Sequence, residues 1–291
     1  MDRTLLVLCD GIGGMANGSV AAEISVASMV SSVFNAVFAQ GDVDLAVAAE
    51  RANRDVFTQL KGKGGSTLVA VLLNPCQVPR GVSVGDSRVY ATDKLRELLQ
   101  LTKDDNLGAL ADVPNGMQVD PSQASHLTQF VGMGDGIAPN TFSLSEDSDR
   151  VLLMSDGVHG CGAVLNEYVF RIEDDLSLVQ SLLVAANHLG GKDNGTMLVS
   201  RLPIMRPLLG PEKGMIIRLT SPFAALEIWL PEFGGSRAQV STREAGPVER
   251  GNPMRAKKPK GTATRSRQKR EKLNPGLAGR GELILDFPGK E

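Results

Sequence analysis

The spacing of apolar residues along the chain predicts one short strand followed by two long helices. Thr4 to Cys9 is an apolar run of the length expected for a buried strand. Apolar side chains then recur at every third or fourth position, first from Ser19 to Phe38 and then from Asp42 to Leu60. This period is that of an amphipathic helix, so we expect two helices that can cover a sheet, the first with Ser19 as its N-cap.

The next part of the chain predicts a series of strands joined by short turns. The expected strands are Thr67–Leu73, Gly81–Val84, Arg88–Thr92 and Leu95–Leu101, followed after a long polar stretch at 103–126 by Arg150–Met154 and Met197–Arg201. A helix is expected near Leu176–Leu189. Strands that follow one another directly favour antiparallel pairing, which indicates an α+β fold.

Composition narrows the class of protein. With 42% hydrophobic and 22% charged residues among 291, the chain is expected to form a packed core. Its three cysteines, Cys9, Cys76 and Cys161, are isolated, so the sequence indicates neither a structural zinc site nor a disulfide framework, and we expect buried thiols. The sequence has neither 18 consecutive apolar residues nor a signal-peptide pattern at its start, so we expect a cytoplasmic protein without a membrane partner.

Charge is distributed unevenly and predicts three parts. Between residues 250 and 272 ten Lys or Arg residues accompany a single Glu, while the whole chain carries −2. We therefore expect a catalytic-type domain at 1–203, an accessory segment at 204–249 with weak strands at Met215–Thr220 and Ala225–Leu230, and a basic, flexible tail at 250–291. The tail is typical of a solvated segment, and binding to an acidic partner or to nucleic acid is the alternative.

The turn Asp10-Gly11-Ile12-Gly13-Gly14 is the first candidate for chemistry. Its glycine spacing resembles a dinucleotide fingerprint, but a carboxylate before the first glycine would repel the pyrophosphate. An Asp at a strand end followed by Gly can instead offer carboxylate and carbonyl oxygens to Mg²⁺ or Mn²⁺. Asp156 and Asp193 stand in similar places, beside expected strands, which strengthens the interpretation as a metal site and leaves three ordinary turns as the alternative.

Six segments, in order along the chain, resemble the motifs of type 2C metal-dependent serine/threonine protein phosphatases. They are Asp10-Gly-Ile-Gly-Gly, Gly65-Ser-Thr-Leu-Val-Ala, Val84-Gly-Asp-Ser-Arg-Val-Tyr, Leu101-Thr-Lys-Asp, Ser148-Asp-Arg-Val-Leu-Leu-Met-Ser-Asp-Gly and Lys192-Asp-Asn-Gly-Thr. The resemblance covers about residues 4 to 201. It implies a four-layer α-β-β-α sandwich of two antiparallel sheets flanked by helices.

The resemblance also implies an activity and its residues. Asp10 resembles the carboxylate that bridges two Mn²⁺ or Mg²⁺ ions, Gly11 a carbonyl ligand, and Asp156 and Asp193 the remaining acids. Asp104 matches an acid associated with a third, weaker ion. In this family a metal-activated water at the dinuclear centre hydrolyses phosphoserine and phosphothreonine in proteins, and an opposing serine/threonine kinase is the implied partner.

Departures from the family leave an alternative open. A first strand with a phosphate-binding Arg and an N-x-D acid is not found before Asp10, and Ile12 stands where some relatives carry a proposed general acid. The alternative is a catalytically impaired module that binds phosphoproteins or a kinase. Asp86-Ser-Arg88 is interpreted as a packed turn with an internal ion pair, and His159 as a residue that could border the cleft. We expect Thr4–Cys9 to be an edge strand that Met215–Thr220 could cover.

Overall fold

The computed structural model describes residues 3–39, 41–74, 77–95, 97–111, 119–189, 193–202, 215–222, 224–230 and 239–243. The chain divides into two compact units, Met1–Leu208 and Leu209–Glu291, and each is described by itself. The expected boundary at residue 203 stays a prediction, and the expected tail at 250–291 lies outside the described residues.

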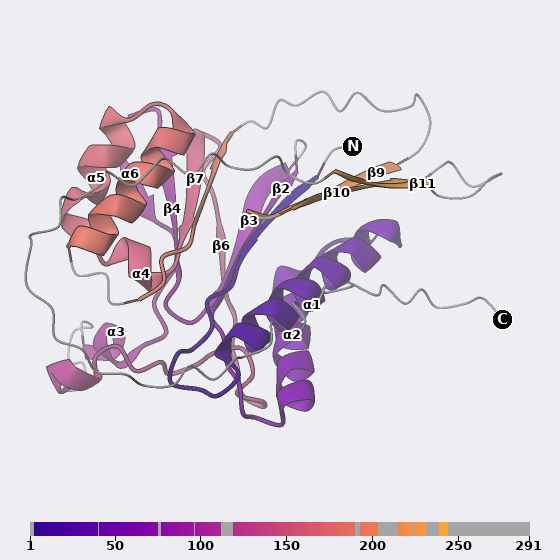
Figure 1. Cartoon of the computed structure of the whole chain (residues 1–291), viewed down its shortest axis with the longest axis horizontal. Coiled ribbons are helices and arrows are strands. Elements are labelled where there is room, and N and C mark those ends of the chain that lie inside the picture. Colours follow the sequence, from indigo (N-terminus) through magenta and orange to yellow (C-terminus); the bar gives the residue numbers. More distant parts are fainter. Residues whose placement is uncertain are drawn as a thin grey trace, which may run out of the picture. The chain divides into compact units, whose positions relative to one another are not determined.

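The first unit contains two antiparallel sheets of four strands each (Figure 1). One has the order β1-β2-β3-β6, with β1 at Thr4–Leu8, β2 at Leu68–Asn74, β3 at Gln77–Val84 and β6 at Asn140–Ser143. The other has the order β5-β4-β7-β8, with β5 at Leu98–Gln100, β4 at Arg88–Asp93, β7 at Ser148–Met154 and β8 at Met197–Arg201. β1 is an edge strand, as expected, because β2 is its only partner among the described strands.

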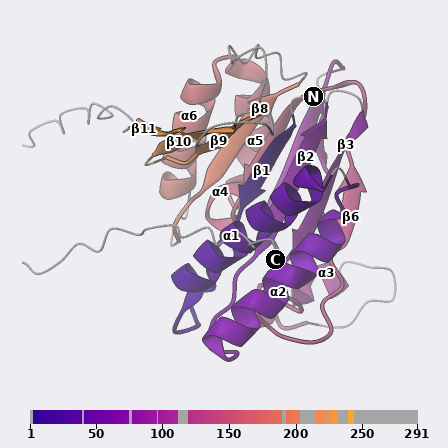
Figure 2. The same ribbon diagram turned by 90° about the vertical axis from the view of Figure 1, so that its right-hand side faces the viewer.

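Helices cover the outer face of each sheet. In Figure 2, α1 (Gly18–Phe38) and α2 (Leu45–Leu60) lie over the β1-β2-β3-β6 sheet. α4 (Asp156–His159), α5 (Gly162–Arg171) and α6 (Asp175–His188) pack on the other sheet. Two short helices, α3 (Leu107–Ala111) and a 3₁₀ turn (Pro121–Gln123), lie outside these layers.

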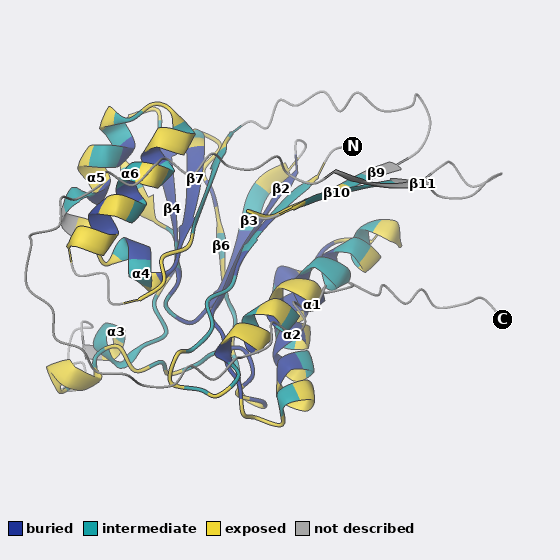
Figure 3. Cartoon of the chain, viewed as in Figure 1, coloured by how far each residue is buried: buried dark blue, intermediate teal, exposed yellow. Residues whose placement is uncertain are grey.

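Three apolar clusters hold the layers together, and β2 shows how the sequence divides among them. Leu68, Ala70 and Leu72 face the helices, whereas the alternate residues Val69 and Val71 face the second sheet. Every residue of β2 is buried, because the strand is covered on both faces (Figure 3). The α+β class and the four-layer α-β-β-α sandwich are therefore confirmed.

Several local expectations were wrong or incomplete. α1 begins at Gly18 with Asn17 as the capping position, so Ser19 is its second residue and not its N-cap. α2 begins at Leu45 because the Asp44 carboxylate accepts hydrogen bonds from the amides of Ala46 and Val47. β6 and α5 were missed: β6 has only four residues and α5 only ten, so each offers few positions for a pattern.

The second unit contains an antiparallel sheet with the order β11-β10-β9. Its strands are β9 (Met215–Thr220), β10 (Ala225–Leu230) and β11 (Gln239–Arg243). The first two match the expected weak strands, and β11 was missed. Arg218 of β9 and Glu227 of β10 form an ion pair at 2.7 Å across this sheet. The idea that Met215–Thr220 covers the edge of β1 stays a prediction.

One described helix, α1, is long and apolar enough to span a bilayer by length and composition alone. Core helices of soluble proteins pass the same test, and Ala21, Met29 and Val33 of α1 lie in the apolar cluster with α2 and β2. These contacts place one side of the helix on the sheet, and 28% of its apolar 18-residue window is buried. Localisation stays a prediction.

Candidate metal centre

Two of the predicted metal ligands, Asp156 and Asp193, act electrostatically on a third, Asp10. Asp10 follows β1, Asp156 follows β7 as the first residue of α4, and Asp193 precedes β8. Burial first, and then the negative charges of Asp156 and Asp193, raise the pKa of Asp10 to about 6. The strand ends thus bring together carboxylates that are 146 and 183 positions from Asp10 in the chain.

The Gly65-Ser66-Thr67 motif fixes the backbone on either side of Asp10. The Asp10 carbonyl accepts hydrogen bonds from the Thr67 amide at 2.8 Å and from Ser66 Oγ at 3.0 Å. The Asp10 amide in turn donates to Thr67 Oγ1 at 3.1 Å. Gly11 is required here, because a Cβ at that position would lie 2.3 Å from the Gly18 carbonyl oxygen at the start of α1.

A second pair of turns brings Asp156 and Asp193 toward each other. A Cβ on Gly157 would lie 2.4 Å from the Asn194 carbonyl oxygen, so the two turns are in backbone contact. The Ser155 amide donates to the Thr196 carbonyl at 3.0 Å, and the Thr196 amide donates to Ser155 Oγ at 3.0 Å. These bonds continue the β7–β8 pairing up to the two acids.

Asp86 belongs to the same electrostatic group, and sequence reasoning missed it. Its pKa is raised to about 6, mainly by burial and then by the negative charges of Asp156 and Asp104. The interpretation of Asp86-Ser-Arg88 as a turn with an internal ion pair is wrong, because Arg88 binds Asp104 instead. The available signal was position: Asp86 follows the buried strand β3 and a glycine, and so resembles Asp10 in context.

The carboxylate of Asp104 is held by Arg88. Arg88 Nη2 donates to Asp104 Oδ2 at 2.7 Å, and Arg88 Nε donates to Oδ1 at 3.0 Å. This is a two-point contact on a carboxylate whose side chain is only 10% exposed. A cation bound at Asp104 would share this carboxylate with the guanidinium, and the role of Asp104 toward a third ion stays a prediction.

His159 borders this group through a backbone contact. Its Nε2 lies 3.0 Å from the carbonyl oxygen of Asp86, which joins α4 to the turn after β3. Burial lowers the pKa of His159, and the positive charge of Arg88 lowers it further. Thr67 Oγ1 lies 2.7 Å from Ser87 Oγ, so the turns that carry Asp10, Asp86 and Asp156 are linked one to the next.

The donor set suits a hard divalent cation. Carboxylate and carbonyl oxygens are the ligands that Mg²⁺ and Mn²⁺ prefer. The pKa of Asp10 is raised by burial and then by the charges of Asp156 and Asp193, and a cation would compensate these charges. In the described part of the chain no three His, Cys, Asp or Glu side chains are gathered tightly enough to hold an ion by themselves. Asp156 and Asp193 each accept a hydrogen bond from the next amide, at 2.7 and 2.8 Å, which orients them along their own turns.

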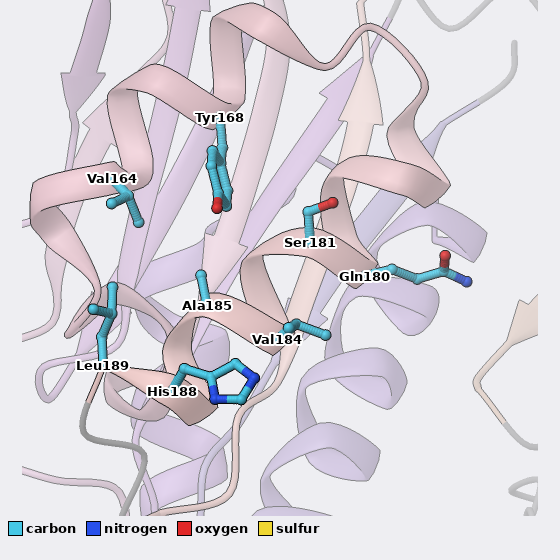
Figure 4. Close-up of a pocket in the computed structure, with 8 residues that line it drawn as sticks. All are labelled: Val164, Tyr168, Gln180, Ser181, Val184, Ala185, His188 and Leu189. Atoms are coloured by element: carbon cyan, nitrogen blue, oxygen red, sulfur yellow. The ribbon is translucent and has the colours of Figure 1, made fainter. Parts of the chain in front are cut away.

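A hollow of about 480 Å³ between α5 and α6 is separate from these acids (Figure 4). It is lined by Val164, Tyr168, Gln180, Ser181, Val184, Ala185, His188 and Leu189. None of the predicted metal ligands is among these residues, so the hollow does not take part in the candidate centre.

Cys161 is buried and Cys9 is partly buried, both as free thiols, and burial raises the pKa of Cys9.

The chain is similar in sequence to bacterial phosphatases, although no family model matches it. It is 29% identical over 210 residues to the serine/threonine protein phosphatase PstP of Mycobacterium tuberculosis. The aligned residues cover 67% of this chain and 40% of PstP. It is 27% identical over 212 residues to the protein phosphatase PhpP of Streptococcus pneumoniae, covering 67% of this chain and 84% of PhpP. The match thus spans less than half the length of PstP.

The chain is also similar in fold to solved structures of bacterial serine/threonine phosphatases. The PPM Ser-Thr phosphatase MsPP of Mycobacterium smegmatis is 27% identical with a TM-score of 0.57, covering 68% of this chain and 88% of that one. The catalytic domain of PstP in complex with two manganese ions is 28% identical with a TM-score of 0.55, covering 67% and 86%. Stp1 of Staphylococcus aureus, at 23% identity and a TM-score of 0.59, shares the fold. The resemblance inferred from the six motifs is confirmed.

Proposed function

Because the chain is a relative of the PPM-family serine/threonine phosphatases, we propose that it hydrolyses phosphoserine and phosphothreonine in proteins with two Mn²⁺ or Mg²⁺ ions. The observation that carries the proposal is that Asp10, Asp156 and Asp193 lie at the ends of β1, β7 and β8, where the charges of Asp156 and Asp193 act on the Asp10 carboxylate. The three acids occur in the same order as the family motifs. Among the ion pairs of the described residues, none involves one of these three carboxylates.

The residues at the proposed metal centre have different roles. Asp10, Asp156, Asp193 and the Gly11 carbonyl would hold the ions, with Asp104 as the candidate for a third, weaker ion. When bound, such ions supply an activated water and neutralise charge on the phosphoryl oxygens. Ser66 and Thr67 hold the backbone of Asp10, which limits the movement of its carboxylate. Ile12 has no titratable proton, so the proton for the leaving group would have to come from water or from another residue.

A second candidate is a phosphatase-like module that binds phosphoproteins or a kinase without turnover. Two observations favour it. The described acids do not form a complete group of ligands by themselves, and Arg88 already occupies both oxygens of Asp104. Hydrolysis distinguishes the two candidates directly.

The partners follow from the proposed reaction. They are phosphoprotein substrates and an opposing serine/threonine kinase, in the cytoplasm. The basic residues between 250 and 272 would add attraction to an acidic partner at low ionic strength.

The test is hydrolysis of a phosphothreonine peptide by the purified chain with Mn²⁺ and with EDTA. We expect Mn²⁺-dependent turnover that is mostly lost in Asp10→Ala, Asp156→Ala and Asp193→Ala, and reduced less in Asp104→Ala. The matched control is Asp147→Ala, because Asp147 is an exposed acid just before β7, whereas Asp156 follows the other end of that strand. Binding of the phosphopeptide without turnover would favour the second candidate, and wild-type turnover in Asp10→Ala would overturn the assignment of ligands.

A further inference from the structure

Asn53 is a polar side chain in the apolar layer between α2 and the sheet. It is 3% exposed, and its neighbours on the same face of α2, Ala49, Ala52 and Val56, are fully buried. Its Oδ1 accepts hydrogen bonds from the amides of Gly132 at 2.8 Å and Gly134 at 3.3 Å. Its Nδ2 donates to the Gly134 carbonyl. Because all of these hydrogen bonds of the buried Asn53 side chain go to one loop, they fix the position of that loop.

The loop is shaped to receive Asn53. Gly132 and Gly134 have φ of +103° and +91°, which side chains other than glycine rarely adopt. A Cβ on Gly132 would lie 2.5 Å from the Gly64 carbonyl oxygen, and one on Gly134 would lie 2.9 Å from the Phe57 ring. The loop backbone is therefore pressed against α2 and against the turn that leads into β2.

The same loop is hydrogen-bonded to the support of Asp10. The Val131 amide donates to the Ser66 carbonyl at 2.8 Å, and the Ser66 amide donates to the Val131 carbonyl at 3.0 Å. The Ser66 hydroxyl lies 3.0 Å from the Asp10 carbonyl oxygen and 2.7 Å from the Thr67 carbonyl oxygen, so its proton is shared between these two acceptors. A continuous path of hydrogen bonds thus runs from Asn53 through residues 131–134 and Ser66 to Asp10.

We infer that Asn53 is a positioning residue for the metal centre: it holds the 131–134 loop so that Ser66 keeps Asp10 in place. The inference rests on the proposed function, because Asn53 can position the metal centre only if Asp10 is a metal ligand. Replacement by Leu keeps the volume close but leaves the loop amides and carbonyl without their partner, so the loop moves and Asp10 loses its fixed support.

The test measures Mn²⁺ affinity by titration calorimetry and amide hydrogen exchange in the metal-free chain. For Asn53→Leu we expect Mn²⁺ to bind about ten-fold more weakly or worse, as for other residues that orient metal ligands. Exchange should rise at Val131, Ser66 and Thr67. Excess Mn²⁺ should restore turnover with little change in KM for the phosphopeptide. The matched control is Val33→Ala, which opens a cavity in the same apolar cluster from α1 and should leave Mn²⁺ affinity and these amides unchanged.

A double-mutant cycle separates positioning from loss of stability. If Asn53 acts through Ser66, the effects of Asn53→Leu and Ser66→Ala on Mn²⁺ affinity are less than additive, whereas Val33→Ala and Ser66→Ala are additive. Should Asn53→Leu fail to fold, Gly134→Ala disturbs the same loop and is expected to weaken Mn²⁺ binding. Native Mn²⁺ affinity and native exchange in a folded Asn53 or Gly134 variant overturn the inference. A wild-type chain that binds Mn²⁺ without hydrolysis overturns the proposed function alone, and one that binds no Mn²⁺ overturns both.

Discussion

Replacing Asp10 by Asn is expected to stabilise the metal-free protein at neutral pH. Burial, and after it the charges of Asp156 and Asp193, raise the pKa of Asp10 from 3.8 to about 6. The folded state therefore binds this proton more tightly than the unfolded state, and ionisation of Asp10 opposes folding. The cost is absent below about pH 4, grows between about pH 4 and 6, and is complete above that range.

The magnitude follows from the shift. About two pKa units at 1.36 kcal/mol each give an upper value of about 3 kcal/mol, and partial exposure to solvent reduces it to about 1 to 3 kcal/mol. Asn is neutral at every pH, and its Oδ1 can still accept the hydrogen bonds that Ser155 and the Gly11 amide give to Asp10. Asp10→Asn should therefore match the wild type at pH 4 and exceed it by this amount at pH 7.5.

The assay is urea unfolding followed by circular dichroism, in EDTA, at several pH values between 4 and 7.5. Asp147→Asn is the control, since Asp147 is 74% exposed and its replacement should give no gain of this size. With Mn²⁺ in place of EDTA the order should reverse, because the wild type alone keeps the ligand and is stabilised by binding. A stability difference that does not change between pH 4 and 7.5 would refute the argument, as would an Asn variant that is less stable than the wild type in EDTA at pH 7.5.

Three further predictions concern the surroundings of the acids. Gly157→Ala should weaken Mn²⁺ binding about ten-fold by calorimetry, because its Cβ would meet the Asn194 carbonyl at 2.4 Å, whereas Gly162→Ala meets no atom within 4 Å and should bind normally. Arg88→Ala should cost about 3 kcal/mol in urea unfolding by leaving the Asp104 carboxylate without its partner, and Arg88→Lys should restore only part of it; equal stability of all three proteins would contradict this reading. A chain ending at Leu208 should still hydrolyse p-nitrophenyl phosphate, because the six motifs lie before that residue; a folded but inert truncation would show that the second unit completes the site.

The sequence by itself determined the elements whose apolar pattern is strong. β1, α1, α2, β2 and β7 lie within a few residues of their expected ranges, because their apolar periods directly report which face is buried. β6 was invisible, since four residues with alternating exposure carry little pattern before a neighbour pairs with them. The candidate ligands were found by their place beside strands and by the order of the motifs, both of which are local features of the sequence.

The tertiary structure alone decided which of these residues meet. Arg88 was expected to pair within its own turn, but the β4–β5 pairing brings it to Asp104, sixteen positions away. Asp86 joined the group of acids, and Asn53 was found to bind a loop 79 to 81 positions further along the chain. Periodicity reports whether a side chain is buried, but the identity of its partner depends on strand register and on how the sheets and helices close around it. The sequence therefore determined the candidate metal ligands, and the packing of the sandwich determined their neighbours and the raised pKa values of Asp10 and Asp86.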